Sequence, residues 1–350
     1  MNSMTLIRSK APLRLGLAGG GTDVSPYSDL YGGFVLNATV DLYAHCTLEL
    51  TEGMQEVEFH ALDLEESFRG SLASEYPLTD SMIIHKAVYN RVVREFNNSR
   101  PLPLRITTWA DAPPGSGLGT SSTLVVAILA AFQELLSLPL GEYDLAHLAY
   151  EIERIDCGFA GGKQDQYAAT FGGFNFMEFY EKERVIVNPL RIRRHIENEL
   201  QSSLLLFFTG RSRESALIIA DQVRSANTDS GNEDGTIAAM HSVKQLALDM
   251  KERILKGDIF GVQELLRRSW EAKKRMAASI SNFEIEHLAG LAISAGAKAV
   301  KISGAGGGGF LMIFVDPLQR FNVINALSGF SGQFHRFQFT HQGVEAWTVK

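Results

Sequence analysis

The sequence has 350 residues, enough for two domains, and 45% apolar with 21% charged residues is the composition of an ordinary soluble protein. The net charge of −7 argues against non-specific nucleic-acid binding, and the longest apolar run, 124–132, is far shorter than the ~20 residues of a membrane span. Cys46 and Cys157 are isolated, and the N-terminus lacks the apolar segment of a signal peptide, so we expect reduced thiols and a cytoplasmic location.

The first half of the chain is expected to alternate strands with helices. Apolar patterning predicts strands at 6–17, 34–50, 104–109 and 174–180, a hairpin within 55–69, and helices at 82–96 and 143–155. Pro12 limits the first strand to an edge or a bend, because proline cannot donate a ladder hydrogen bond.

The second half begins after a charged, irregular segment at 184–201, where we place a boundary between domains 1–190 and 191–350. The remaining patterns predict helices at 214–225, 237–255, 259–276, 285–295 and 318–327, and strands at 204–209, 299–302, 310–315, 334–339 and 344–349. Strands and helices mixed in this order predict an α+β layered fold.

The segment 113–132, PPGSGLGTSSTLVVAILAAF, is the most informative stretch. Gly115, Gly117 and Gly119 allow backbone N–H groups to approach a ligand, and hydroxyl residues from Thr120 onward suit the first turn of a helix. The apolar run that follows is typical of a buried helix. We interpret the segment as a phosphate-binding loop at a helix N-terminus, where free N–H groups and the helix dipole favour anions.

Other interpretations of this loop fit less well. A plain Gly/Ser linker before a core helix stays open on local grounds. A Walker loop would end in Gly-Lys-Ser/Thr, whereas here no lysine is present. A dinucleotide-binding fingerprint requires glycine at the sixth position of GxGxxG, where Thr120 stands.

Two further glycine clusters carry polar residues. Residues 19–21 are followed at once by Thr22 and Asp23, which could equally form a local turn or helix cap. The cluster 304–309 leads into a predicted strand and could be a turn that needs positive φ. Between the second and third clusters, Glu153 and Asp165 flank or lie in another glycine-rich stretch, 158–166.

Together these segments resemble the motifs of the GHMP kinases. The resemblance is carried by 11–23, APLRLGLAGGGTD, by 113–122, PPGSGLGTSS, and by 301–309, KISGAGGGG; 157–166 is similar to a lengthened CGxxDQ turn of galactokinases. It implies an N-terminal domain like ribosomal protein S5 domain 2, a ferredoxin-like C-terminal domain, and an active site between them. The block 16–41 most resembles the branch that phosphorylates the anomeric hydroxyl of a heptose 7-phosphate, with fucokinases and galactokinases as the alternatives.

The resemblance implies ATP and Mg²⁺ as cofactors and assigns residues to them. Asp165 is the expected general base, and Arg14 would keep it ionised. Ser121 and Glu153 would bind Mg²⁺. The ATP-binding residues would be Pro114, Gly115, Ser116, Gly117, Leu118, Gly119, Thr120, Ser121 and Ser122.

The expected partner is a small phosphosugar, with no nucleic acid or membrane, and a homodimer is left open. The substrate-binding residues would be Gly21, Thr22, Asp23, Gly162, Lys163, Gly306 and Gly307. Lys163, Arg211 and Arg213 are candidates for holding the sugar's own phosphate, although each could be a solvated surface charge.

Two other classes of protein remain alternatives. A sugar sensor without catalysis could use the same scaffold, but it would have no need for a metal ligand and a base. A nucleotide-dependent dehydrogenase is disfavoured by the incomplete fingerprint.

Overall fold

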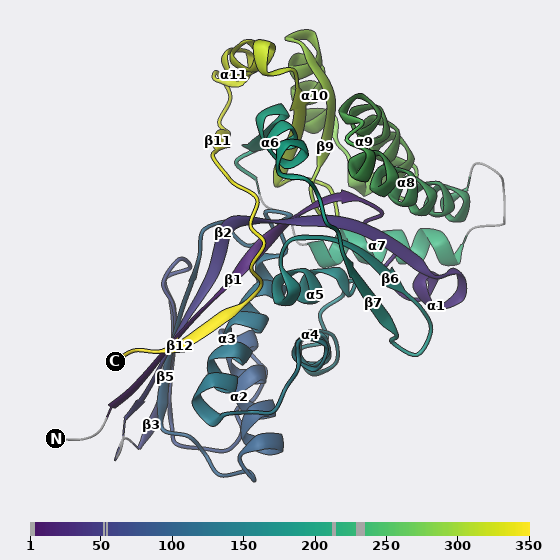
Figure 1. Cartoon of the computed structure of the whole chain (residues 1–350). Helices are drawn as coiled ribbons and strands as arrows, with labels where there is room; N and C mark the ends of the chain where they lie inside the picture. Colours follow the sequence, from purple (N-terminus) through teal and green to yellow (C-terminus); the bar gives the residue numbers. More distant parts are fainter. Residues whose placement is uncertain (1–3, 52, 54, 212–214, 229–234) are drawn as a thin grey trace.

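The computed structural model describes residues 4–51, 53, 55–211, 215–228 and 235–350, and its secondary structure forms two sheets with helices packed on them (Figure 1). The first sheet contains β1 (Met4–Ala18), β2 (Gly33–Thr51), β3 (Glu56–Ala61), β4 (Glu66–Ser71), β5 (Leu104–Ala110), β6 (Phe174–Phe179), β7 (Val185–Pro189) and β12 (Glu345–Thr348). Its order is β12-β1-β2-β5-β3-β4. The long strand β2 pairs with β5 at one end and with β6 at the other, and β7 lies beyond β6.

Helices cover both faces of the first sheet. One face carries α2 (Ile83–Phe96), α3 (Thr120–Leu136), α4 (Glu142–Glu151), a π-helical turn (Ile152–Asp156) and α5 (Gln164–Phe171). The residues of α3 from 125 to 132 are all buried, which explains the uninterrupted apolar run. A short helix, α1 (Tyr27–Tyr31), follows β1.

The second sheet is antiparallel, in the order β11-β8-β10-β9. Its strands are β8 (Leu204–Phe208), β9 (Ala297–Ile302), β10 (Phe310–Val315) and β11 (Gln333–His335). The helices of this part are α6 (Arg194–Ser203), α7 (Ser215–Asn227), α8 (Thr236–Lys256), α9 (Ile259–Lys274), α10 (Phe283–Ser294) and α11 (Arg320–Leu327). After β11 the chain returns to the first sheet, where β12 pairs with β1 (Figure 1).

A bulge in β1 determines the face of the sheet on which Arg14 lies. The β1–β2 register shifts between Pro12 and Arg14, in agreement with the bend expected at Pro12. Before the shift, Ile7 and Ala11 pack in the core beneath α2 and α3; after it, Leu13 belongs to the core shared with α8 and α9. An inserted residue reverses the alternation of a strand. Arg14 therefore lies on the face that carries α3.

Most predicted elements are confirmed, and the differences have local reasons. The charged segment 184–201 was expected to be irregular, but it contains β7 and the start of the short amphipathic helix α6. The strand expected at 334–339 is only β11, because beyond His335 the chain leaves the sheet. The helix expected at 143–155 is α-helical only to Glu151 and continues as the π-helical turn. In the described part of the chain, no helix has the length and apolar character that crossing a membrane requires.

Candidate active site

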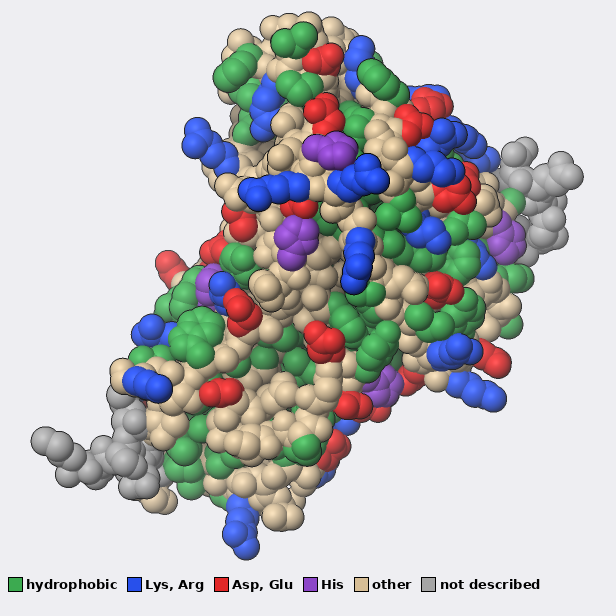
Figure 2. All heavy atoms as spheres, viewed as in Figure 1, with side chains coloured by type: hydrophobic (Ala, Val, Ile, Leu, Met, Phe, Trp, Pro, Cys, Tyr) green, Lys and Arg blue, Asp and Glu red, His purple; other side chains and the backbone are tan. Residues whose placement is uncertain are grey.

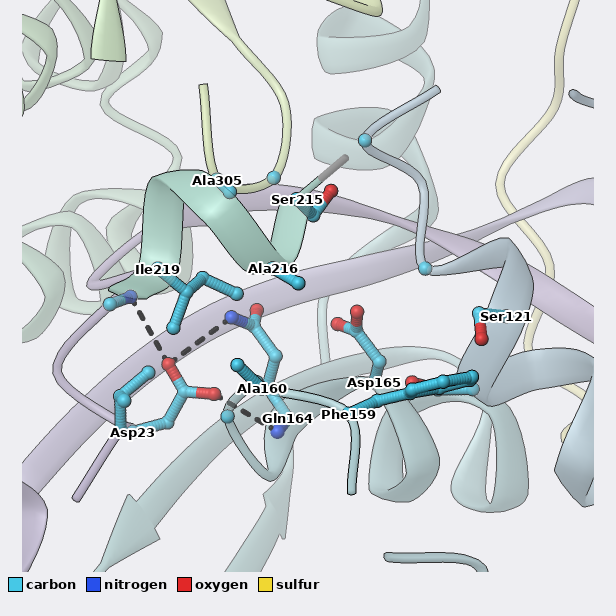
Figure 3. A pocket seen from close by; sticks show the side chains of 18 of the residues that line it. Asp23, Ser121, Phe159, Ala160, Gln164, Asp165, Ser215, Ala216, Ile219 and Ala305 are labelled. Carbon is cyan, nitrogen blue, oxygen red and sulfur yellow. Dashed lines mark hydrogen bonds between the residues drawn. The ribbon is translucent and has the colours of Figure 1, made fainter. Parts of the chain in front are cut away.

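A cavity of about 620 Å³ lies where the first sheet's helices meet α7, α9 and the loop after β9. Its lining comes from segments far apart in the chain. The first half contributes the end of β1, the loop 113–119 with the start of α3, the π-helical turn and the segment leading into α5; the second half contributes the first two turns of α7 and the end of α9. Figure 3 shows Asp23 and Asp165 within it, with residues of α7 above them and Ser121 at the start of α3.

The loop before α3 presents bare backbone amides to this cavity. Gly115, Gly117 and Gly119 have φ of +70°, +83° and +81°, a conformation that other residues rarely adopt. Their N–H groups have no acceptor among the described residues. Helix α3 begins at Thr120 without a side-chain cap. Free N–H groups at a helix N-terminus can hold the oxygens of a phosphate.

The third glycine cluster braces this loop from behind. A Cβ on Gly117 would lie 2.3 Å from the Ser303 carbonyl oxygen, and one on Gly309 would lie 2.2 Å from that of Ser116. The N–H of Phe310 donates to the Ser116 oxygen at 2.9 Å. The two glycine-rich segments therefore touch backbone to backbone, and side chains on either would force them apart.

Asp165 lies beside the bare amides and is paired with Arg14. Arg14 donates to Asp165 Oδ1 through Nε at 2.7 Å and through Nη2 at 2.6 Å, while its Nη1 donates to the Gly117 oxygen at 2.6 Å. A Cβ on Gly119 would lie 3.0 Å from the Asp165 carboxyl carbon. Arg14 is 3% exposed, so this ion pair is largely shielded from water. The pair connects the carboxylate directly to the loop.

Glu153 is held by hydroxyls at the start of α3. Its Oε1 accepts from Ser121 Oγ at 2.9 Å, and its Oε2 accepts from Ser122 Oγ at 2.6 Å and Gln166 Nε2 at 2.7 Å. Arg154 Nη1 lies 3.3 Å from Oε1. Glu153 is 2% exposed and sits in the π-helical turn, a distortion that often occurs at functional sites.

Asp23 occupies the other end of the cavity, at the N-terminus of α5. Its Oδ2 accepts from the N–H groups of Lys163 and Gln164 at 3.0 and 3.1 Å. Its Oδ1 accepts from the N–H of Gly21 at 3.1 Å and from Gln164 Nε2 at 3.3 Å. A Cβ on Gly162 would lie 1.9 Å from Oδ2. Asp23 is thus fixed by backbone donors, with a carboxylate where the helix dipole favours it.

Several predicted site residues do not line the cavity. Thr22, Ser116 and Leu118 are buried behind the lining, where the Thr22 hydroxyl donates to the Gly19 oxygen and the Leu118 oxygen accepts from the N–H of Arg14. Gly306 and Gly307 are turned toward Ile280, whose oxygen accepts from the N–H of Gly307 at 2.7 Å. Gly304 and Ala305 line the cavity instead.

Two of the three cations considered for a sugar phosphate, Lys163 and Arg211, are not among the described lining residues. Lys163 contributes its N–H to Asp23, but its ammonium is buried beneath the site, 3.9 Å from Asp29 Oδ1 and over the Tyr150 ring. Arg211 is exposed and pairs with Glu284 at 3.1 Å. Arg213 lies outside the described residues.

The sequence-based prediction missed five polar lining residues: Arg154, Gln164, Ser215, Gln222 and Lys273. Lys273 had a recognisable signal. It follows Val262, Leu266 and Ser269 on the buried stripe of α9, so a lysine stands where the helical pattern calls for an apolar residue. Burial, together with the neighbouring charge of Arg14, lowers its pKa to about 8 against the opposing effect of Asp23 and Asp165.

Comparison with known proteins identifies the class of protein. Residues 83–173 match the GHMP kinases N terminal domain, and residues 250–331 match the GHMP kinases C terminal domain. The chain is 47% identical over 347 residues to the D-glycero-alpha-D-manno-heptose 7-phosphate kinase of Campylobacter jejuni, an alignment that covers 99% of this chain and 100% of that protein. The chain belongs to the GHMP kinase family.

Solved structures agree with this assignment. The structure of a D-glycero-D-manno-heptose 1-phosphate kinase from Bacteroides thetaiotaomicron is 46% identical, has a TM-score of 0.83, and is matched over 98% of this chain and 99% of its own. The galactokinase of Lactococcus lactis, solved with galactose, is 18% identical with a TM-score of 0.74, covering 97% and 95% of the two chains, and shows a shared fold. The expected two-domain GHMP kinase fold is confirmed.

Proposed function

We propose that this protein is a sugar kinase that uses ATP to phosphorylate the anomeric hydroxyl of D-glycero-D-manno-heptose 7-phosphate, forming the 1,7-bisphosphate. The observation that carries the proposal is the position of Asp165. This carboxylate touches the loop of bare amides through Gly119 and faces the same cavity as Asp23. A proton acceptor beside a phosphate seat, with a second carboxylate across the cavity, suits phosphoryl transfer to an alcohol.

ATP would place its phosphates on the loop 114–122. The N–H groups of Gly115, Gly117 and Gly119 are available to phosphate oxygens, and the start of α3 adds its dipole. The bracing by Ser303 and Gly309 keeps these donors in place before the nucleotide arrives, so no reorganisation is needed at that moment.

Mg²⁺ would be held by Ser121 and Glu153. Mg²⁺ prefers oxygen ligands and commonly takes one or two carboxylates with substrate phosphates and water. One carboxylate and one hydroxyl at the start of α3 fit that requirement, and no group of three or more His, Cys, Asp or Glu in the described residues forms a separate metal site. When bound, the ion would offset negative charge on the phosphates.

The chain's own residues would move one proton. Asp165 accepts the proton of the anomeric hydroxyl through the oxygen that Arg14 leaves free, while that hydroxyl oxygen forms its bond to the γ-phosphorus and the bond to the β-phosphate oxygen breaks. Arg14 stays paired with Oδ1 and keeps the carboxylate oriented. Asp23 accepts hydrogen bonds from sugar hydroxyls, since an ionised carboxylate is purely an acceptor.

The choice of a heptose rests on the two relatives at 46–47% identity, both of which are named as heptose phosphate kinases. The names differ in the position of the phosphate that is already present, 7 in one and 1 in the other. We favour the 7-phosphate, which leaves the anomeric hydroxyl free to meet Asp165.

We further propose a cytoplasmic location, supported by the free cysteines Cys46 and Cys157. We also propose that the chain divides into domains at 1–190 and 191–350, with β12 returning to the first sheet.

The test is an ADP-release assay with Mg²⁺ and a panel of sugars. The panel contains heptose 7-phosphate, heptose 1-phosphate, fucose, galactose and mannose, each at equal concentration. The proposal predicts the largest kcat/KM for heptose 7-phosphate. A larger value for fucose or galactose would move the protein to another branch of the family, and ATP consumption that no sugar stimulates would overturn the assignment as a sugar kinase.

A further inference from the structure

Two buried polar groups line the cavity and have no place in the mechanism above. The first is the ammonium of Lys273, which is 2% exposed. An ammonium has three donors, and the only acceptor that the described residues offer it is the Gly304 oxygen, at 2.5 Å. Burying a charge with unused donors is costly unless something pairs with them.

The second group is the side-chain oxygen of Gln164. It is buried and has no hydrogen-bond partner among the described residues. Its orientation is settled by the other end of the amide, because Nε2 donates to Asp23 Oδ1 and only a nitrogen can do so. Figure 3 shows the Gln164 side chain between Asp23 and Asp165, which line the same cavity.

The two groups border the same small volume. A Cβ built on Gly20 would lie 3.5 Å from Lys273 Nζ and 3.7 Å from Gln164 Nε2. Lys273 also feels the charges of both Asp23 and Asp165, so it lies near both carboxylates. An unused donor and an unused acceptor that border one volume can both be satisfied by a single hydroxyl group, which accepts from one and donates to the other.

We propose that Lys273 and Gln164 form the subsite for the sugar hydroxyl adjacent to the reacting one, with Lys273 Nζ donating to it and Gln164 Oε1 accepting from it. The inference rests on the proposed function, which puts the reacting oxygen at Asp165. The Gln164 side chain lies beside Asp165, so we assign the pair to the hydroxyl nearest the reacting one, at C2. The pair would select sugars with a free 2-hydroxyl, because an analogue without it leaves two buried groups unpaired.

The pairing also joins the two halves of the molecule. Gln164 belongs to α5, beneath the first sheet, whereas Lys273 belongs to α9 and is bonded to the loop after β9. A sugar bound between them would contact both halves at once. A purely structural lysine that only fixes Gly304 predicts no dependence on any particular sugar hydroxyl, and this difference makes the two roles separable.

The experiment is a double-mutant cycle in which one change removes a side chain of the protein and the other removes the 2-hydroxyl of the sugar. kcat/KM is measured for heptose 7-phosphate and its 2-deoxy analogue with wild type, Lys273→Met and Gln164→Leu. Wild type should lose about 10- to 100-fold on the analogue, and each variant should lose a similar factor on the natural sugar. Each variant should then discriminate less between the two sugars than the wild type does, with the KM for ATP unchanged. Lys274→Met is the matched control, because Lys274 pairs with Glu271 and Glu286 outside the cavity.

Several outcomes would overturn the subsite. One is a wild type that does not distinguish the two sugars; another is a variant that keeps the wild-type preference between them. A loss in Lys273→Met that disappears when the sugar lacks its 7-phosphate would assign the ammonium to that phosphate instead. If Lys273→Met fails to fold, Gln164→Leu alone decides. The absolute wild-type rate on heptose 7-phosphate tests the proposed function, and the ratio between the sugars tests the subsite, so the two fail separately.

Discussion

Arg14 donates twice to the same oxygen of Asp165, through Nε at 2.7 Å and Nη2 at 2.6 Å. The other carboxylate oxygen, Oδ2, has no donor among the described residues, and the third guanidinium nitrogen is bound to the Gly117 oxygen. The arginine therefore orients the carboxylate without occupying the oxygen that would take a proton. Because Arg14 bonds to both Asp165 and the Gly117 oxygen, it also fixes the carboxylate relative to the loop that would bind the phosphates.

This arrangement predicts the effect of Asp165→Asn. An amide of the same shape keeps the fold but cannot accept the proton, so kcat should fall by roughly 10²–10⁴-fold while the KM for ATP changes little. The melting temperature should fall as well, because Arg14 loses its charged partner. Stopped assays of ADP formation, together with thermal melts, check both parts. Asp156→Asn is the matched control: Asp156 is bonded to Arg91 outside the cavity, so this variant should lose stability and keep its kcat. Near-normal turnover by Asp165→Asn would move the base elsewhere.

Glu153→Gln should weaken the response to Mg²⁺. Glu153 accepts from the hydroxyls of Ser121 and Ser122 at the start of α3, and replacing it removes the charge that would attract the cation. We expect the Mg²⁺ concentration for half-maximal activity to rise about tenfold or more, as when one charged ligand is lost. A titration of initial rate against Mg²⁺ at fixed ATP measures this. Glu151→Gln, which loses a contact with Arg91 instead, should leave the titration where it is.

The bare loop and α3 could be predicted because their signals are local. Glycines at 115, 117 and 119 and the apolar run after them determine a turn and a buried helix from neighbouring residues alone. The pairing of Arg14 with Asp165 could be predicted only through the resemblance to a family. Their meeting depends on the bulge after Pro12; the proline indicated an edge or a bend there, but not the face to which Arg14 would point.

Residues whose role depends on distant packing were harder to predict. Lys163 lies in a glycine-rich stretch and was expected to bind the substrate. Its N–H instead donates to Asp23, and its side chain turns under the site toward Asp29. Lys273 lies more than a hundred residues beyond Asp165 in the chain, and nothing in the local sequence of α9 shows that its stripe ends in a cavity. The α6 helix was missed because its high charge hid a three-residue buried face, Ile196, Leu200 and Ser203.

Gly162→Ala should impair sugar binding without affecting the nucleotide. A methyl group at Gly162 would lie 1.9 Å from Asp23 Oδ2, so either the carboxylate or the segment before α5 must move. We expect the KM for the sugar to rise at least tenfold while the KM for ATP stays within twofold, on the order expected for losing a hydrogen bond to a charged group. Gly158→Ala provides the comparison from the same segment, since a Cβ there would meet nothing within 4 Å despite a φ of +69°. Equal sugar KM values for the two variants would contradict the contact.

The buried ammonium of Lys273 predicts a pH dependence of stability. Burial and Arg14 lower its pKa to about 8 in the folded state, although Asp23 and Asp165 act in the opposite direction, whereas in the unfolded chain it is near 10.4. The unfolded chain binds the extra proton between these two values, so the ammonium destabilises the fold below pH 8 and this penalty is relieved as the pH rises to about 10.5. Its size is about 3 kcal/mol. Denaturant unfolding of wild type and Lys273→Met is measured from pH 7 to 10.5. The free energy of unfolding of the wild type should rise relative to that of the variant; a constant difference between the two would contradict the prediction.

The central claim is that free backbone N–H groups of the loop bind the phosphates while Asp165 takes the proton from the acceptor hydroxyl opposite them. The most direct test is a crystal structure with a non-hydrolysable ATP analogue, Mg²⁺ and heptose 7-phosphate. We predict phosphate oxygens within hydrogen-bond distance of the N–H groups of residues 115–120, and the anomeric oxygen bonded to Asp165 and directed at the γ-phosphorus. A triphosphate bound away from that loop, or an anomeric oxygen remote from Asp165, would contradict the account.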